Sequence, residues 1–127
     1  MKVMSFDFDS TLSRQDVQDY AVSIMKKGID VWVVTARFDD LHKHRYPFNP
    51  TNEDLYAVVD KIGIPRCKIR FMCMEAKHLY LYESGVLVHL DDDYIEINGI
   101  NKFTNTVGIS VVGGNGWKNK CNKILEL

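Results

Sequence analysis

The chain has few cysteines, and none of them belongs to a recognisable pair. Its three cysteines are Cys67, Cys73 and Cys121, an odd number without a Cys-x-x-Cys motif. A disulfide scaffold normally needs an even number of cysteines, and a structural zinc site needs closely spaced ones. The sequence therefore argues against both and favours a protein of a reducing compartment.

The chain also lacks an excess of one charge and a long apolar run. Sixteen Lys and Arg residues oppose seventeen Asp and Glu residues, a formal net charge of −1. No overall field therefore draws the protein to nucleic acid or to an anionic membrane, although a local patch is compatible with this balance. No apolar stretch reaches the roughly 18 residues of a membrane helix. Asp7 interrupts the N-terminal apolar run, which argues against a signal peptide. We expect a cytoplasmic protein without a membrane span.

A length of 127 residues is enough for one domain, which we expect to cover residues 1–127. Short β-branched and aromatic runs alternate with patterns of helical spacing. The predicted strands cover residues 3–8, 31–34, 68–74, 86–90 and 107–112, and the predicted helices cover residues 16–27, 53–62, 76–82, 94–100 and 117–127. This alternation predicts a Rossmann-like three-layer α/β/α domain with a five-stranded parallel sheet.

Side chains with oxygen donors stand at the ends of three predicted strands. They are Asp7 and Asp9 after the first strand, Thr35 after the second, and Asp91, Asp92 and Asp93 after the fourth. Ligands of open parallel sheets bind beyond the carboxyl ends of the strands. We therefore expect the two acidic clusters and the hydroxyl to converge on one rim of the sheet.

These acidic clusters predict a magnesium site. Each string alone is compatible with a helix cap or a turn. Converging carboxylates, however, resist joint ionisation unless a cation neutralises them. An all-oxygen set of ligands suits Mg²⁺, and these segments contain no Cys and only one His, His89, which lies inside a predicted strand. The combination of the three strings is therefore more informative than any one of them.

The order of these strings resembles the haloacid dehalogenase (HAD) superfamily of phosphatases and phosphotransferases. Its first motif, an apolar strand ending in Asp-x-Asp-x-Thr, corresponds here to FDFDSTL. Its second motif, an apolar strand ending in Thr or Ser, corresponds to VWVVTAR, and its fourth, ending in two acids, corresponds to VLVHLDDD. The third motif is a Lys before or early in a helix. Lys77 lies in the expected interval, with Lys68 as the alternative.

The resemblance implies a catalytic or substrate-binding role for each matching residue. Asp7 would attack phosphorus and become an aspartyl-phosphate, and Asp9 would act as general acid and then general base. Thr35 and the backbone N–H of Ala36 would bind phosphoryl oxygens, and Lys77 would neutralise the phosphate and the nucleophile. The implied activity is that of a phosphoric monoester hydrolase.

The resemblance also implies how Mg²⁺ is held. Its ligands would be Asp7, the backbone carbonyl of Asp9, and one acid of the fourth motif. Asp92 is the expected direct ligand, and Asp91 would support it.

Three residues near these motifs have two interpretations each. Arg37 could clamp a second phosphate or a carboxylate, or it could form a surface ion pair with Asp39 or Asp40. Glu96 has the spacing of a further acid that orients metal-bound water, or it is a solvated helix residue. Asp93 is expected to cap a helix rather than to bind metal.

The spacing of the motifs leaves no room for the cap domain that many HAD proteins carry. Capless members often act on macromolecular phosphates, which themselves close the site. The closest likeness is to the phosphatase domain of polynucleotide kinase–phosphatases, which shares the hydroxyl-x-Arg second motif and a Gly-x-Pro turn, here Gly63-Ile64-Pro65. The loop HKHRYPFNP contributes a basic and aromatic patch at His42, Lys43, His44, Arg45, Tyr46 and Phe48. We therefore expect a phosphorylated partner, a nucleic-acid end or a nucleotide.

Other functions remain as alternatives. A phosphoaspartate receiver domain also uses an acidic pair, a Thr and a Lys, but its phosphoacceptor follows the third strand, where this chain has Met72-Cys73-Met74. A non-catalytic scaffold of the same fold would not need the acids. A two-metal nuclease of the toprim type places a lone Glu on an earlier strand, an order that this chain does not have. The order of the motifs favours the phosphatase.

Overall fold

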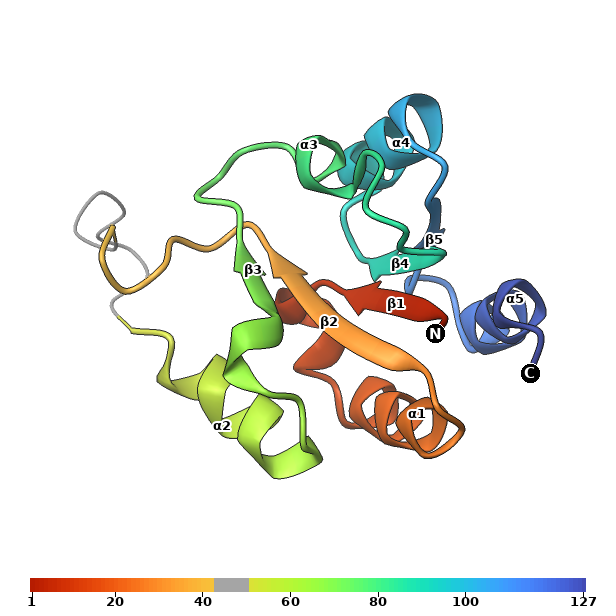
Figure 1. Cartoon of the computed structure of the whole chain (residues 1–127), viewed down its shortest axis with the longest axis horizontal. Helices are drawn as coiled ribbons and strands as arrows, with labels where there is room; N and C mark the ends of the chain where they lie inside the picture. The colour runs from red at the N-terminus through yellow and green to blue at the C-terminus, as the bar shows by residue number, and fades with distance from the viewer. Residues whose placement is uncertain (43–50) are drawn as a thin grey trace.

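The computed structural model, which describes residues 1–42 and 51–127, contains a sheet of five parallel strands. The strands are β1 (Val3–Phe6), β2 (Asp30–Thr35), β3 (Ile69–Phe71), β4 (Val88–Asp91) and β5 (Val107–Ser110). Their order across the sheet is β3-β2-β1-β4-β5, and every neighbouring pair is parallel (Figure 1). The predicted five-stranded parallel sheet is confirmed.

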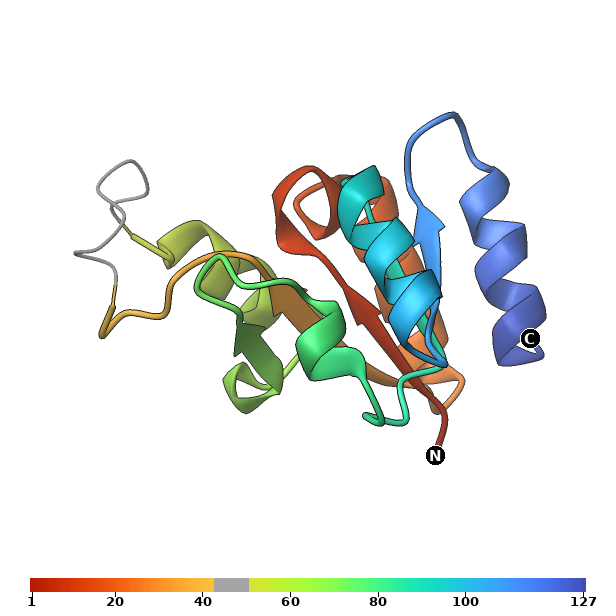
Figure 2. The same cartoon turned by 90° about the horizontal axis from the view of Figure 1, so that it is seen from above.

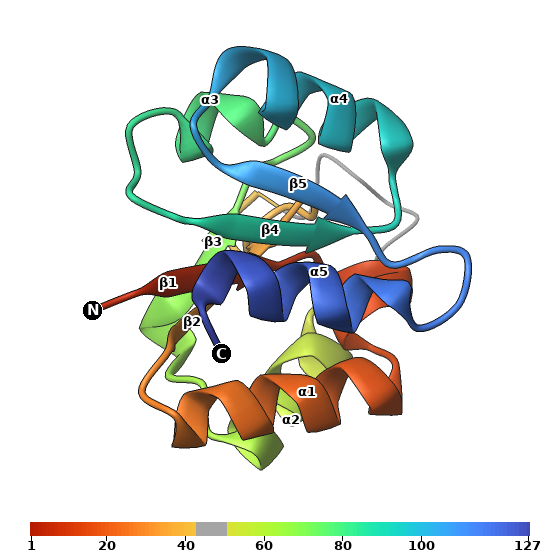
Figure 3. The ribbon, with the colours of Figure 1, turned by 90° about the vertical axis from the view of Figure 1, so that its right-hand side faces the viewer.

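Helices cover both faces of the sheet. They are α1 (Gln15–Lys26), α2 (Glu53–Ile62), α3 (His78–Leu81), α4 (Tyr94–Phe103) and α5 (Gly116–Leu125), with a π-turn η1 (Phe8–Leu12) and a 3₁₀ turn η3 (Arg66–Lys68). Figure 3 shows α3 and α4 on one side of the sheet and α1, α2 and α5 on the other, and Figure 2 views the molecule from the side of α3 and α4. The predicted three-layer arrangement is therefore also confirmed.

Apolar side chains fill the space between the sheet and the helices. The larger cluster joins the inner faces of α1, α2 and α5 to the sheet and includes Phe6, Leu90 and Trp117. A smaller cluster lies under α3 and α4 and includes Val34, Leu81 and Ile100. Apolar residues recur at helical spacing in these helices because one face of each helix is buried against the sheet. Burial of such faces is the main favourable contribution to folding.

The central strand β1 and its neighbour β4 carry a row of polar side chains on one face of the sheet. On β1 and β4, Met4, Phe6, Val88 and Leu90 belong to the larger apolar cluster. Successive side chains of a strand point to opposite faces. Ser5 and Asp7, which alternate with the apolar residues of β1, therefore face the layer of α3 and α4. His89 and Asp91 alternate in the same way on β4, and Ser5 is the register partner of His89.

The strand β1 ends earlier than the sequence predicted, because the chain turns tightly after Phe6. The backbone N–H groups of Leu12 and Ser13 donate to the carbonyls of Asp7 and Phe8, each at 3.0 Å, which are bonds to the fifth preceding residue. Ser10 adopts a left-handed conformation with φ of 58°. This turn places residues 7–9 at the carboxyl edge of the sheet.

The two ends of the described chain lie side by side (Figure 1). Lys2 donates from Nζ to the carbonyl of Leu125 at 2.8 Å. Of the helices in residues 1–42 and 51–127, none has the length and apolar character needed to cross a membrane.

Candidate active site

Asp7 lies at the carboxyl end of β1, the central strand of the sheet. Its backbone N–H donates to the carbonyl of Leu90 at 2.9 Å, so the main chain is held against β4. The residue is 5 % exposed. Its Oδ2 atom accepts a long hydrogen bond of 3.4 Å from the Thr11 hydroxyl, which ties the η1 turn back to the carboxylate. The remaining oxygen, Oδ1, faces Lys77.

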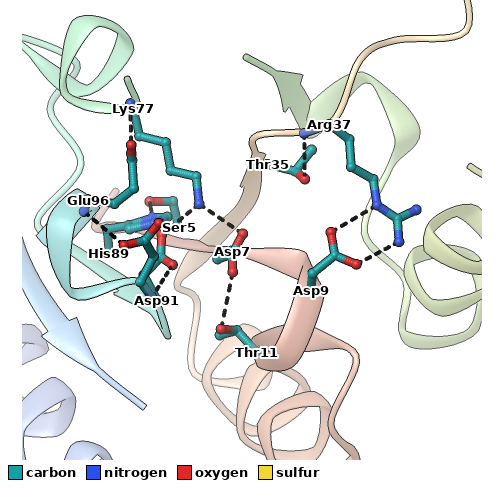
Figure 4. Close-up of polar contacts among 11 residues, drawn as sticks. Ser5, Asp7, Asp9, Thr11, Thr35, Arg37, Lys77, His89, Asp91 and Glu96 are labelled. Carbon is teal, nitrogen blue, oxygen red and sulfur yellow. Dashed lines mark hydrogen bonds and ion pairs between the residues drawn. The ribbon is translucent and has the colours of Figure 1, made fainter. Parts of the chain in front are cut away.

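Lys77 joins Asp7 to the acids that follow β4. It directly precedes α3, and its Nζ atom donates to Asp7 Oδ1 at 2.8 Å and to Asp91 Oδ2 at 2.6 Å (Figure 4). The Lys77 side chain is only 2 % exposed. The alternative lysine, Lys68, forms an ion pair with Asp30, the first residue of β2. Lys68 therefore lies near the amino ends of the strands, whereas Asp7 lies at their carboxyl ends. The structure therefore places Lys77, and not Lys68, beside Asp7.

Burial and neighbouring charges shift the protonation of this group. Burial raises the pKa of Asp7 to about 8 against the opposing charge of Lys77, and the charge of Asp91 and a hydrogen bond with Asp92 add to the increase. Burial acts against the charge of Lys77, but Asp7 and Asp91 prevail and raise its pKa. Burial likewise opposes the charge of Asp91, yet hydrogen bonds with His89 and Lys77 lower its pKa. Without a further cation, the site has an excess of negative charge.

The three carboxylates of this edge can share one cation. Oxygen atoms of Asp7, Asp91 and Asp92 lie within 4.8 Å of one another. Asp91 is fully buried and uses both oxygens, since Oδ2 accepts from Lys77 and His89 while Oδ1 accepts from the backbone N–H of Asp93 at 3.0 Å. Asp92 is partly exposed. An oxygen-rich set of this kind fits a hard divalent cation, with Asp92 as the most accessible of the three ligands.

Thr35 ends β2, the strand next to β1. It is fully buried, and its Oγ1 atom accepts from the backbone N–H of Arg37 at 3.3 Å. The hydroxyl hydrogen is not used in this bond. Ala36 follows at the same edge, where its carbonyl accepts from the backbone N–H of Met74 at 2.7 Å and so joins the loops after β2 and β3. The expected hydroxyl therefore stands on the rim where Asp7 stands.

Arg37 is buried and binds two acids. Its guanidinium donates to both oxygens of Asp9 at 3.0 and 2.7 Å and to both oxygens of Asp54 at 2.7 and 2.9 Å. It also lies over the ring of Phe8, 4.9 Å from the ring centre. The alternative of an ion pair with Asp39 or Asp40 is wrong. Asp54 extends from the first turn of α2, and only the packing of α2 brings it to Arg37.

Asp9 lies beyond the turn from Asp7 and is directed elsewhere. Figure 4 shows its carboxylate pointing toward Arg37 rather than toward Asp7. The side chain is 58 % exposed, whereas that of Arg37 is 7 % exposed. Asp9 is thus accessible to solvent while its orientation is set by a buried cation.

Two acids on the loop and helix after β4 have structural contacts. Asp93 caps α4, because its Oδ1 atom accepts from the backbone N–H groups of Ile95 and Glu96 at 2.9 and 3.4 Å, and the predicted cap is confirmed. Glu96 accepts from the backbone N–H of Lys77 at 2.9 Å. Glu96 therefore fixes the main chain from which Lys77 reaches Asp7, a contact that its spacing in the sequence did not predict.

A buried hydrogen-bonded chain extends from Asp91 into the sheet. His89 Nε2 lies 2.8 Å from Asp91 Oδ2, and His89 Nδ1 lies 2.7 Å from Ser5 Oγ. His89 and Ser5 are both fully buried. Burial lowers the pKa of His89, although Asp91 acts in the opposite direction. The neutral ring therefore donates from Nε2 to Asp91 and accepts from Ser5 at Nδ1.

A cavity of about 510 Å³ opens beside the acidic group. It is lined by Ser10, Arg14, Asp92, Val111, Val112, Gly113, Gly114 and Asn115. Because Asp92 is among the lining residues, the cavity offers space next to this carboxylate for the remainder of a substrate. Of the predicted basic and aromatic patch, Lys43, His44, Arg45, Tyr46 and Phe48 lie outside the described residues. His42 is bound to Asp39, with 2.7 Å between Nδ1 and Oδ1.

Searches of protein-family models, curated proteins and solved structures found no match to this chain. The interpretation of the site therefore depends on its geometry and on the motifs in the sequence.

Four residues of the site had no predicted role or a different one: Ser5, Asp54, His89 and Glu96. Two of them left a signal in the sequence, because Ser5 and Asp7 are spaced by two residues, as are His89 and Asp91. Polar side chains spaced by two on neighbouring buried strands share one face of the sheet. Asp54 left no comparable signal, since an acid in the first turn of a helix is common. The spacing of Glu96 pointed to metal-bound water rather than to the backbone N–H of Lys77.

Proposed function

We propose that this chain is a Mg²⁺-dependent phosphomonoester hydrolase of the HAD type, with Asp7 as nucleophile. The observation that carries the proposal is the position of the Asp7 carboxylate. It is buried at the end of a central strand, paired with Lys77, and within 4.8 Å of further acids. A buried carboxylate in contact with a buried ammonium group and close to further acids is typical of a reacting centre rather than of a cap.

The first chemical step is attack by Asp7 on phosphorus. A carboxylate oxygen of Asp7 forms the new bond to phosphorus while the bond from phosphorus to the ester oxygen breaks. The leaving oxygen takes a proton from the Asp9 carboxyl group, and the product is an aspartyl-phosphate. Lys77 stabilises the negative charge that gathers around the phosphoryl group, and Thr35 has a hydroxyl hydrogen to donate to a phosphoryl oxygen.

The second step returns the enzyme to its starting state. Asp9, now a carboxylate, takes a proton from a water molecule whose oxygen attacks phosphorus. The bond between Asp7 and phosphorus breaks, and inorganic phosphate leaves. Asp9 suits this exchange because it is exposed to solvent, but its carboxylate must leave Arg37 and turn toward Asp7. Arg37 is then free to hold a substrate anion with its released donors.

Magnesium fits the residues that are present. Asp7 and Asp92 would hold it, together with the backbone carbonyl of Asp9, and Asp91 would support them through Lys77. Burial raises the pKa of Asp7, and the negative charge of Asp91 adds to the increase. A divalent cation would favour the ionised carboxylate against both effects. When bound, Mg²⁺ supplies positive charge that keeps Asp7 ionised and attracts the phosphoryl group.

The substrate that we propose is the phosphate of a nucleic-acid end or of a nucleotide. Between β1 and β2 the chain forms only η1 and α1, so no inserted domain covers Asp7 from that segment. The 510 Å³ cavity beside Asp92 leaves room for a bulky group on the phosphate. Activity across oligonucleotide ends, mononucleotides and sugar phosphates with Mg²⁺ separates these substrate classes. A preference for sugar phosphates would contradict the substrate while leaving the mechanism intact.

The receiver alternative fits the topology poorly. Receivers have the strand order 2-1-3-4-5, whereas here β1 lies between β2 and β4. The acidic cluster lies at the carboxyl ends of β1 and β4. The segment after β3, where a receiver carries its phosphoacceptor, is Met72-Cys73-Met74. A phosphoprotein that forms but never turns over would restore this alternative, and absence of Mg²⁺ binding would favour a scaffold.

The decisive experiment measures hydrolysis of an aryl phosphate with Mg²⁺ by the wild type and the Asp7→Asn variant. We expect Asp7→Asn to abolish turnover, because an amide cannot form the acyl-phosphate. Asp19→Asn, which changes an exposed acid on α1 that contacts Gln15, is the matched control and keeps full activity. Acid quenching of the wild type during turnover, followed by peptide mass analysis, locates the phosphoryl group on Asp7. Turnover by Asp7→Asn at the wild-type rate would refute the proposal.

A further inference from the structure

The Ser5–His89–Asp91 chain occupies positions in the sheet where apolar side chains would be expected. All three residues are fully buried. The same strands bury Met4, Phe6, Val88 and Leu90 on their other face. A buried polar group is costly unless it is hydrogen-bonded. Ser5 and His89 form a hydrogen bond with each other across the two strands. The other ring nitrogen of His89, Nε2, is directed at Asp91.

Hydrogen bonds hold both carboxylate oxygens of Asp91. Its Oδ1 atom accepts from the backbone N–H of Asp93, and its Oδ2 atom accepts from both His89 and Lys77. A carboxylate only accepts hydrogen bonds, so His89 donates from Nε2 whatever the state of Nδ1. The donation holds the carboxylate plane in the orientation in which Oδ2 also meets Lys77.

Lys77 depends on this orientation for its place beside Asp7. Its ammonium group sits between Asp7 Oδ1 and Asp91 Oδ2, at 2.8 and 2.6 Å. Glu96 fixes the main chain of Lys77, but the long side chain of Lys77 is directed by the two carboxylates. If Asp91 rotates, Lys77 loses the partner that keeps it in contact with Asp7 (Figure 4).

We propose that His89 is a positioning residue, which holds Asp91 as the acceptor for Lys77 and so keeps Lys77 on the nucleophile Asp7. The inference rests on the proposed function, because it assigns His89 a part in that reaction without contact with the substrate. Ser5 completes the device by fixing the other nitrogen of the ring. Partners of this outer kind typically contribute about 10- to 100-fold to activity or metal affinity.

A pair of amide substitutions tests the proposal. The side-chain nitrogen of glutamine can occupy the place of Nε2, whereas that of asparagine reaches only the place of Nδ1. We expect His89→Asn to lower kcat for an aryl phosphate by about tenfold or more with little change in KM. His89→Gln keeps the donor to Asp91 and should stay within about threefold of the wild type.

Stability is controlled separately. Cys121→Ala removes a fully buried sulfur atom from α5, which lies on the face of the sheet opposite α3 and α4, and it should lower stability through the larger apolar cluster. If kcat merely follows thermal stability across Cys121→Ala, His89→Asn and His89→Gln, His89 is only a structural residue. Equal kcat values for the Asn and Gln variants would also overturn the proposal.

A second measurement judges the proposal when no turnover is found in the wild type. In a double-mutant cycle of His89→Asn and Lys77→Met, followed by denaturant unfolding, we expect the combined loss of stability to be smaller than the sum of the single losses. Additive losses would refute the link between His89 and Lys77. If the wild type shows no turnover but the losses of stability are non-additive, the proposed function is refuted and the link between His89 and Lys77 stands.

Discussion

Lys77 and Asp7 form a buried ion pair of 2.8 Å between residues 70 positions apart in the chain. The two side chains are 2 % and 7 % exposed. A charge pair so far from solvent is costly to desolvate, and removal of Lys77 would leave the Asp7 carboxylate uncompensated. The pair therefore links the stability of the fold to the chemistry that we propose.

Removal of the Lys77 charge should destabilise the protein. In Lys77→Met, Asp7 and Asp91 lose their common partner inside the protein, and we expect the unfolding free energy at pH 8 to fall by about 3 kcal/mol. Phosphatase activity should disappear in the same variant. Chemical denaturation followed by circular dichroism measures the stability change. Lys61→Met, at an exposed position on α2, is the control and should unfold like the wild type.

The raised pKa of Asp7 predicts a specific dependence of stability on pH. The pKa rises from 3.8 to about 8, so the folded state holds a proton that the unfolded state has lost. The contribution of Asp7 to stability is thus fully present below about pH 4 and is lost as the pH rises through about 8. With a chelator present, Asp7→Asn should come close to the wild type at pH 4 and exceed its melting temperature at pH 9. Equal melting temperatures at both values would contradict the shift.

Arg37 should not tolerate replacement by lysine. Arg37→Lys keeps the charge but cannot hold both Asp9 and Asp54 with two bonds each. We expect a loss of about 2 kcal/mol in unfolding free energy. We also expect a lower kcat, because a lysine at this position cannot hold a substrate anion with two bonds. The control is Arg66→Lys. Arg66 holds Asp60 with the same two-bond geometry on the exposed surface, and its replacement should change little. Equal effects of the two substitutions would argue against a role for burial.

Asp91 and Asp92 should respond differently to replacement by asparagine. Asp91→Asn leaves Lys77 and His89 with a weaker acceptor and should lower stability markedly, because all three groups are buried. Asp92→Asn should leave stability nearly unchanged but weaken Mg²⁺ binding by at least about tenfold, as expected for a direct ligand. Titration calorimetry with Mg²⁺, together with thermal unfolding, separates the two effects. The reverse pattern would make Asp91 the ligand.

The turn after β1 should prefer glycine at one position. Ser10 has φ of 58°, a conformation that costs energy for a residue with a Cβ atom. Ser10→Gly should therefore raise the unfolding free energy by about 0.5 kcal/mol, and Ser10→Val should lower it. Ser13→Gly is the matched control, because Ser13 has φ of −65°, which suits any residue. Glycine at this position should lower the unfolding free energy, since it increases the conformational freedom of the unfolded chain. Thermal unfolding at one fixed pH checks all three.

Most of the fold could be predicted from local patterns. The α2 boundaries at Glu53 and Ile62 agree with the prediction, and the Asp93 cap was also predicted correctly. Such features depend on neighbours within one turn of helix or on the alternation of one strand, which the sequence displays directly. Strand ends were predicted less well, because β1 stops at Phe6 when its backbone turns into η1.

The sequence by itself determined which side chains stand at the carboxyl edge of the sheet, since Asp7, Thr35 and Asp91 each end an apolar run whose burial defines a strand. The tertiary structure alone decided which of them meet. Arg37 binds Asp54 rather than its near neighbours, and His89 meets Ser5 across the sheet. Ion pairs and hydrogen bonds form only when the two atoms lie within about 3.5 Å of each other. Such distances depend on how helices and strands pack and not on the spacing of residues along the chain.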